Sequence, residues 1–187
     1  QQKRFKKIWI HRLIARYYVK SDYVHPIGKT GKWETGVSSI TNTNKTNTNT
    51  RVLQFKPTDT SYVYNRRLSE DFQYIEEVAS GYFEYANTLK KFGYKVGGRA
   101  EYSMVDGSSK LDTVNFKKQY FYLFPAAFIT YKLPDNQTIG ASYSTRINRP
   151  NFWDMMPYID DSDPNNYRLG NPNLAPAYTH NAEMTYN

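Results

Sequence analysis

The residues best suited to chemistry lie in an acid-rich stretch near the end of the chain, "MMPYIDDSDPNNYRLGN". Asp161, Asp163 and Asn165 recur at every second position, the spacing of the first oxygen ligands in a calcium-binding loop. The second half of such a loop is missing, because Asn166 stands where glycine is required and Pro172 where a bidentate glutamate is required. We therefore interpret the stretch as a loop that makes its own Asp/Asn/Pro turns, and predict no metal site.

The same region combines aromatic rings with carboxylates, which suits contact with an external ligand. Flat aromatic faces can grip a sugar or a peptide, and long surface loops commonly carry binding residues. The candidate ligand-binding residues are Trp153, Tyr158, Asp160, Asp161, Asp163 and Tyr167.

Signals of enzymatic chemistry are thin. His11, His25 and His180 are scattered, and none has a partner at metal-ligand or catalytic-triad spacing. The absence of cysteine excludes a disulfide framework, a thiolate zinc site and a cysteine nucleophile. No nucleophile elbow, phosphate-binding loop or dinucleotide fingerprint is present. The sequence predicts no enzyme activity, no catalytic residue and no cofactor.

Charge and hydropathy do not indicate a nucleic-acid partner or a membrane helix. The net charge is +8, but its one basic cluster, "KRFKK" at the start, is typical of a solvated strand end or loop. The longest apolar stretch, Tyr120 to Tyr131, is too short to cross a membrane as a helix. Tyrosine is abundant, at 18 residues, and favours half-buried strands and the boundary between apolar and wet surfaces.

Alternation of polar and apolar residues predicts the elements that carry these side chains. In "YKVGGRAEYSM" (Tyr94 to Met104) nearly every second residue is apolar, which indicates a strand with one apolar and one wet face. The same pattern runs through Ile139–Asn148 and 180–187. Weaker alternation marks 12–24, 31–39, 80–89 and 119–133. We predict about seven strands and no helix.

The lengths of the connections favour a membrane barrel. "HPIGKTG", "NTLKKFG" and "LPDNQ" are short turns, and they alternate with long polar segments at 41–72, 105–118 and 149–178. In an antiparallel meander all short turns then fall at one end, as in outer-membrane barrels with short periplasmic turns. A soluble β-sandwich also predicts alternation, but it does not predict this segregation of loops by length. Within the long segments, "TNTNKTNTNT" (Thr41 to Thr50) is predicted to be a flexible external loop tip.

The alternation also assigns two faces. Tyrosines near strand ends, namely Tyr94, Tyr102, Tyr131 and Tyr143, are predicted to form an interfacial girdle. The predicted lipid-facing residues are Val96, Ala100, Tyr102, Ile139, Ala141, Tyr143 and Ile147. The predicted lumenal residues are Lys95, Arg99, Glu101, Ser142, Ser144 and Arg146.

The end of the chain resembles a signature of TonB-dependent outer-membrane receptors, closest to the branch described as an outer-membrane β-barrel family. The signature is an Arg-x-x-Arg-Pro strand end, an aromatic loop, Gly-Asn-Pro-Asn-Leu-x-Pro, and an alternating strand with an early glutamate. The matching residues are Arg146, Arg149, Pro150, Gly170, Asn171, Pro172, Asn173, Leu174, Pro176 and Glu183. One departure is Ala177, where the family usually has an acid.

We interpret this motif as scaffold for the re-entry of a long loop into the sheet. Pro172 and Pro176 keep their neighbours extended, and Gly170 and Asn171 are expected to adopt the left-handed geometry of a turn.

The resemblance implies an all-β, antiparallel transmembrane β-barrel of about 22 strands, to which this chain contributes about seven. An unclosed sheet in lipid would leave backbone groups unpaired. Residues 1–187 are therefore expected to be part of one outer-membrane β-barrel domain, with the plug and the remaining strands outside this chain.

The resemblance further implies TonB-dependent active import of a scarce ligand across the bacterial outer membrane. Siderophores, oligosaccharides, vitamins and peptides are the ligand classes of such receptors, and the fold does not choose among them. The implied partners are the TonB energy-transducing complex, outer-membrane lipid and a surface lipoprotein. The alternative is a non-transporting barrel that acts as a scaffold, an adhesin or a partner in a surface complex. A soluble carbohydrate-binding sandwich is a third possibility.

Overall fold

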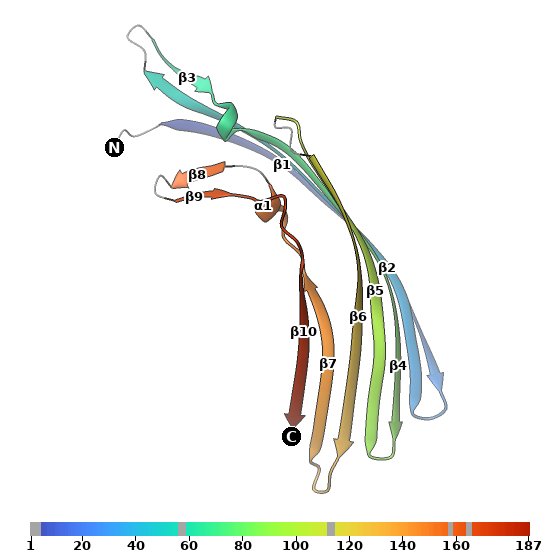
Figure 1. The fold of residues 1–187 in the computed structure, drawn as a ribbon. Coiled ribbons are helices and arrows are strands. Elements are labelled where there is room, and N and C mark those ends of the chain that lie inside the picture. Colours follow the sequence, from blue (N-terminus) through green and yellow to red (C-terminus); the bar gives the residue numbers. More distant parts are fainter. Residues whose placement is uncertain (1–4, 56–58, 112–114, 157–158, 164–165) are drawn as a thin grey trace.

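The computed structural model describes residues 5–55, 59–111, 115–156, 159–163 and 166–187, and these form one large curved sheet (Figure 1). Its seven-strand path runs β1-β2-β4-β5-β6-β7-β10, and β3 pairs with β2 at one end. The strands of the path are β1 (Lys6–Ile27), β2 (Gly31–Phe55), β4 (Glu70–Leu89), β5 (Phe92–Ser109), β6 (Asn115–Lys132), β7 (Thr138–Asn148) and β10 (Ala177–Tyr186). The predicted antiparallel all-β architecture is confirmed.

Smaller elements fill the connections at the opposite end from the short turns. β3 (Thr60–Tyr64) and the 3-10 helix η1 (Arg66–Leu68) lie between β2 and β4. The helix α1 (Phe152–Met155) and the two-stranded sheet of β8 (Ile159–Asp163) and β9 (Asn166–Leu169) lie between β7 and β10. The helix α1 is absent from the predicted elements, because four residues are too few to show a helical period. No helix of the described residues is long and apolar enough to span a membrane.

The prediction of a loop tip at Thr41–Thr50 is wrong. These residues form the middle of β2, paired with β1 on one side and, as far as Thr48, with β4 on the other. Ladder partners on both sides satisfy the backbone, so a polar sequence remains extended here. The sequence pattern does not indicate a strand here because neither face of the segment is apolar, whereas the strand signal depends on one apolar face.

The outer, convex face carries a broad apolar band bounded by horizontal rows of the sheet. At one boundary, Trp33 pairs with Tyr85, and Tyr94 lies two residues before Val96, the partner of Tyr85 on β5. At the other, the row Ser39–Ala79–Tyr102–Phe121 gives way to Thr41–Glu77–Met104–Gln119. From Tyr94 to Met104 the strand advances about 33 Å, which at a tilt of about 40° spans about 25 Å. The band therefore has the height of a lipid-facing belt.

Register confirms the predicted division of residues between two faces. Val96 lies opposite Ala127, which lies opposite Tyr143, and all three belong to the apolar face. Lys95 and Ser142 both lie opposite Phe128, on the other face. Tyr102 and Ile139 are exposed although they are large and apolar. A soluble sandwich would bury such a face against a second sheet, and within the described residues these side chains remain exposed.

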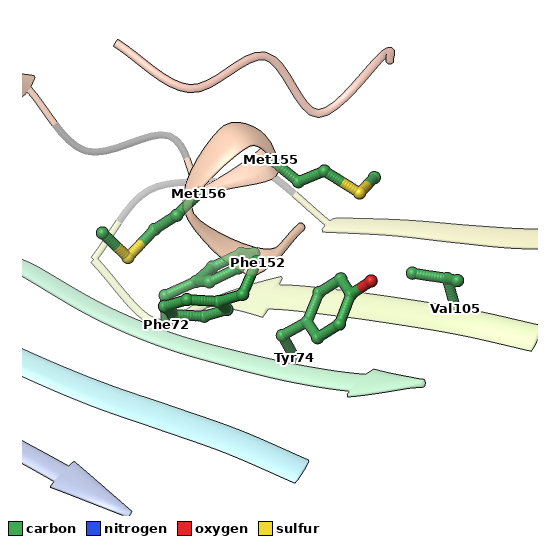
Figure 2. Close-up of a cluster of buried hydrophobic side chains, with 6 residues drawn as sticks. All are labelled: Phe72, Tyr74, Val105, Phe152, Met155 and Met156. Carbon is green, nitrogen blue, oxygen red and sulfur yellow. The ribbon is translucent and has the colours of Figure 1, made fainter. Parts of the chain in front are cut away.

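The concave face carries the core, which lies at the end away from the short turns. Phe72, Tyr74 and Val105 of β4 and β5 are buried beneath α1, which contributes Phe152 and Met155 (Figure 2). Met156 completes the cluster, and Phe116 and Tyr120 pack against it. The ring centroids of Phe72 and Phe152 are 5.9 Å apart, and Tyr74 meets Phe152 edge-on at 5.8 Å. These contacts hold the β7–β10 connection against the inside of the sheet.

Candidate functional site

The candidate site is the β7–β10 connection, residues 149–176, where it lies on the concave face. Arg149 begins it with a charge clamp. Its guanidinium donates a hydrogen bond to the Glu101 carboxylate, and its Nε lies 4.0 Å from Glu76 Oε1. Glu101 is also paired with Arg99 at 3.0 Å, and Asn42 donates a 3.1 Å hydrogen bond to Glu76. The side chains of Glu101, Glu76 and Arg149 are 7%, 18% and 24% exposed, so these three charges are largely withdrawn from water and depend on one another.

Lys118 of β6 fixes the other end of the connection. Its ammonium donates hydrogen bonds to the backbone carbonyls of Pro172, at 2.6 Å, and Leu174, at 3.1 Å. The Pro-Asn-Leu part of the sequence motif is thus bound by a lysine that lies on a strand more than fifty residues earlier in the chain. Two basic side chains therefore hold the connection against the sheet. Arg149, at its start, binds carboxylates of β4 and β5, and Lys118 of β6 binds backbone carbonyls near its C-terminal end.

Gly170 is required for a different reason from the one that the sequence predicts. The described residues with positive φ are Gly28, Lys90, Asp135 and Asn136, so neither Gly170 nor Asn171 adopts the predicted left-handed geometry. A Cβ at Gly170 would instead lie 2.2 Å from the carbonyl oxygen of Met156. Asn171 donates a 2.6 Å backbone hydrogen bond to the carbonyl of Asp154. The glycine permits two backbone segments to touch beside α1.

The helix α1 is short but capped at its start. The Asn151 side chain accepts hydrogen bonds from the backbone N–H groups of Trp153, at 2.9 Å, and Asp154, at 3.1 Å. Asp154 in turn binds Arg168 of β9 at 2.9 Å. The Asn151 cap orients the helix so that Phe152 enters the core, while Trp153 remains 42% exposed.

Trp153 is the predicted ligand-binding residue that the structure places best. The guanidinium of Arg12, on β1, lies 4.3 Å from the centre of its ring. Arg12 and Trp153 are separated by most of the chain, so the connection reaches across the concave face from β7 to β1. The pair presents a cation and a ring face, which are suited to a polar ligand with a flat or anionic part.

The other predicted ligand-binding residues are less well defined. Tyr167, on β9, is described and 75% exposed, with no ring contact to the rest of the site. Asp160, Asp161 and Asp163 belong to β8, but their side chains lie outside the described part of the structure, as does Tyr158. Among the described residues, no cluster of three or more potential metal-binding groups is found.

The remaining motif residues occupy separate places. Arg146 is exposed, in contrast to Arg149, and Pro150, Leu174 and Pro176 line a small hollow with Tyr74 and Glu76. Glu183 lies at the middle of β10, where it accepts a 2.6 Å hydrogen bond from Asn181. These positions support the interpretation of the motif as scaffold for the connection.

Burial changes the acid–base behaviour of one group in the site. The pKa of the Tyr74 phenol is raised, first by burial and second by the nearby Glu76 carboxylate. Tyr74 lies beyond the apolar band and remains neutral at physiological pH. It acts as packing for Phe152 and not as a proton donor or acceptor.

Comparison with known proteins places this geometry in a family. A family model described as "Outer membrane protein beta-barrel family" matches residues 3–187. The chain belongs to the outer membrane protein beta-barrel family. The apolar convex face of this family barrel is accordingly its lipid-facing surface, the concave face is its lumen, and its location is the bacterial outer membrane.

A solved structure supports the fold. The family barrel resembles the crystal structure of the ferric citrate transporter FecA in the unliganded form, with a TM-score of 0.55 and 16% sequence identity. The match covers 79% of this chain and 22% of the FecA chain, so the chain spans about a fifth of the length of that relative. A search of curated proteins found no match.

Proposed function

We propose that the barrel to which this chain belongs imports a ligand across the outer membrane with energy relayed by TonB. The observation that carries the proposal is the inward position of the β7–β10 connection, which Arg149 and Lys118 fasten across the lumenal face. A freely open pore does not require a long connection held inside by buried charges. A transporter that first captures its ligand does require binding groups on the path through the barrel.

The arrangement around Trp153 supports capture at this position. Its ring is partly exposed, lies beside Arg12, and rests on a helix that the core holds in place. A ligand can therefore meet a preorganised surface, which lowers the entropic cost of binding. The ligand classes considered are those of the family resemblance: a ferric siderophore, a vitamin, an oligosaccharide or a peptide.

Uptake by cells tests the proposal. We would compare the parent strain, a strain lacking the gene and a TonB-depleted strain, with a panel of labelled ferric citrate, cobalamin, maltohexaose and an oligopeptide. The expected result is loss of uptake of one probe in both altered strains. Replacing Trp153 by alanine should lower that uptake about tenfold, because an aromatic ring that a bound ligand covers contributes about one to several kcal/mol to binding. Arg146→Gln, at an exposed position near the end of β7, serves as the matched control and should retain uptake.

The alternative function predicts a different pattern. A non-transporting scaffold, adhesin or partner in a surface complex would leave uptake of every probe unchanged in the strain that lacks the gene. Deletion of the gene would instead remove a second surface protein, such as a lipoprotein, from the outer membrane. That outcome would contradict import.

A further inference from the structure

The short turns of the sheet carry an unbalanced group of lysines. Residues 28–30, 90–91 and 132–137 contain four lysines and one carboxylate, Asp135. All four lysines are exposed: Lys29, Lys90, Lys91 and Lys132. We call them the turn lysines. They come from three separate hairpins, and the sheet brings these hairpins to one end of the barrel wall (Figure 1).

Aromatic side chains mark the level of the membrane beside these turns. On the outer face the ring centroids of Tyr23 and Trp33 are 5.2 Å apart, those of Trp33 and Phe83 are 6.0 Å apart, and those of Tyr85 and Tyr94 are 5.9 Å apart. Such a row of amphipathic rings is typical of the boundary between hydrocarbon and headgroups. The row therefore places the edge of the bilayer core just inside the turns.

The turn lysines lie at headgroup height. Lys91 precedes Tyr94 by three residues, which is about 10 Å along the strand and about 8 Å along the membrane normal at a tilt of about 40°. The headgroup layer extends about 5–7 Å beyond the hydrocarbon core on each side. A lysine side chain is long enough to span the small difference and to direct its ammonium towards lipid phosphates.

The charges of the turn lysines are not neutralised by the protein. The backbone N–H of Lys132 donates a 2.9 Å hydrogen bond to the carbonyl of Lys91, which places two like charges on adjacent hairpins. Lys32 and Lys95, slightly deeper on the lumenal face, are paired with Glu34 and Glu84. Within the described part of the chain, no turn lysine forms an ion pair. Neighbouring like charges repel, so an anion from outside the protein is expected to stabilise this end.

The opposite boundary of the apolar band lacks this excess. Its outer-face residues beyond the band include Lys45 and Lys117 but also Asp71 and Asp106, and Asp71 is paired with Lys110 at 3.5 Å. Mixed charge of this kind gives little preference for an anionic surface. Lys6, Lys7 and Arg51 lie farther out at that end, so the comparison concerns the residues next to the band. Next to the apolar band, the basic excess is confined to the short-turn end.

We propose that the turn lysines bind the phosphates of anionic phospholipid headgroups in the periplasmic leaflet. Lysine is a point-charge phosphate ligand, and each lysine near an anionic surface contributes about fivefold in affinity. The aromatic row supplies the adjacent contact for the upper acyl chain and the glycerol region. The site fixes the height of the barrel and does not depend on the proposed transport.

Native mass spectrometry of the full-length detergent-solubilised protein tests this proposal. The probes are phosphatidylglycerol and phosphatidylcholine with identical acyl chains, present in equal amounts. We expect the wild-type protein to retain phosphatidylglycerol at least about fivefold in excess. Equal retention of the two lipids by the wild-type protein would overturn the proposal.

Three variants separate the turn lysines from general charge effects. The combined substitution K29Q/K90Q/K91Q/K132Q should abolish the preference, and the corresponding Lys→Arg variant should retain it. The matched control K45Q/K117Q, at the opposite boundary, should behave as the wild type. Electrophoretic mobility of the unheated sample shows whether the combined Lys→Gln variant is folded. If it is unfolded, the smaller variant K90Q/K91Q, confined to one turn, should still lower the preference for phosphatidylglycerol.

Inorganic phosphate distinguishes a lipid from a soluble ligand. If free phosphate at equal concentration displaces phosphatidylglycerol completely, the site is one for soluble phosphate and the lipid assignment fails. Retention of the lipid under these conditions supports the assignment. An unchanged preference in the combined Lys→Gln variant would also overturn it.

Discussion

At the residue scale, two arginines of one sequence motif have different roles. Arg149 is clamped between Glu101 and Glu76, whereas Arg146 is exposed. We predict that Arg149→Met loosens the β7–β10 connection and costs about 2 kcal/mol locally, because Glu101 keeps only its Arg99 partner. Amide hydrogen exchange at 150–156 and 166–176 in the full-length protein should then be about 30-fold faster.

The matched variant Arg146→Gln should leave exchange in these segments unchanged. Adding Glu101→Leu to Arg149→Met should recover part of the protection, because the unpaired buried carboxylate is removed. Equal effects of the Arg146 and Arg149 substitutions would show that the clamp does not hold the connection.

At the element scale, β2 extends well beyond the apolar band as a polar strand. Thr46, Thr48 and Thr50 face the lumen and are almost fully buried, while alternate residues such as Lys45 face outward. We predict that the amides of 41–48 are protected from exchange for minutes or longer, because they are paired on both sides. Exchange measured by mass spectrometry on the full-length protein in detergent provides the check.

A proline substitution gives a second measure of the same strand. Thr43→Pro removes a ladder hydrogen bond from a strand with two neighbours and should abolish protection locally, at a cost of about 3 kcal/mol. Proline at Thr60, the first residue of β3, should have little effect because a strand's first position tolerates it. Rapid exchange of wild-type 41–48 would restore the loop interpretation.

At the scale of the whole molecule, the segregation of turns sets the orientation in the membrane. We predict that the short-turn end faces the periplasm and the extended ends of β2, β4, β5 and β6 face the exterior. Single cysteines at Asn136, in the β6–β7 turn, and at Lys45, on β2, report on the two ends. Residues 1–187 contain no cysteine, and the full-length protein without an introduced cysteine serves as the labelling background.

A membrane-impermeant maleimide added to intact cells should label Lys45→Cys and spare Asn136→Cys. Both should react once the outer membrane is permeabilised, which controls for burial of the thiol. Labelling of Asn136→Cys in intact cells would reverse the orientation and with it the leaflet assigned to the turn lysines.

The local chemistry of the sequence determined most of the strands and their two faces, whereas the family of the barrel came from the resemblance of its C-terminal motif to a known signature. Alternation in 94–104 and 139–148 assigned Val96 and Tyr143 to one face and Lys95 and Ser142 to the other, since a strand's side chains alternate whatever surrounds it. The short turns were equally readable, because their residues specify their geometry locally.

Only the tertiary structure decided the form of the candidate site. Glu76, Lys118 and Arg12 contribute to it from three strands, and no spacing in the sequence relates them to Arg149, Pro172 and Trp153. The sequence predicts that Gly170 serves a left-handed turn, whereas the structure shows that it permits close approach to the Met156 backbone, which is a long-range packing constraint. The polar run at 41–50 became a strand because two neighbours pair with it. Pairing between distant segments depends on the whole sheet, so no local pattern could report it.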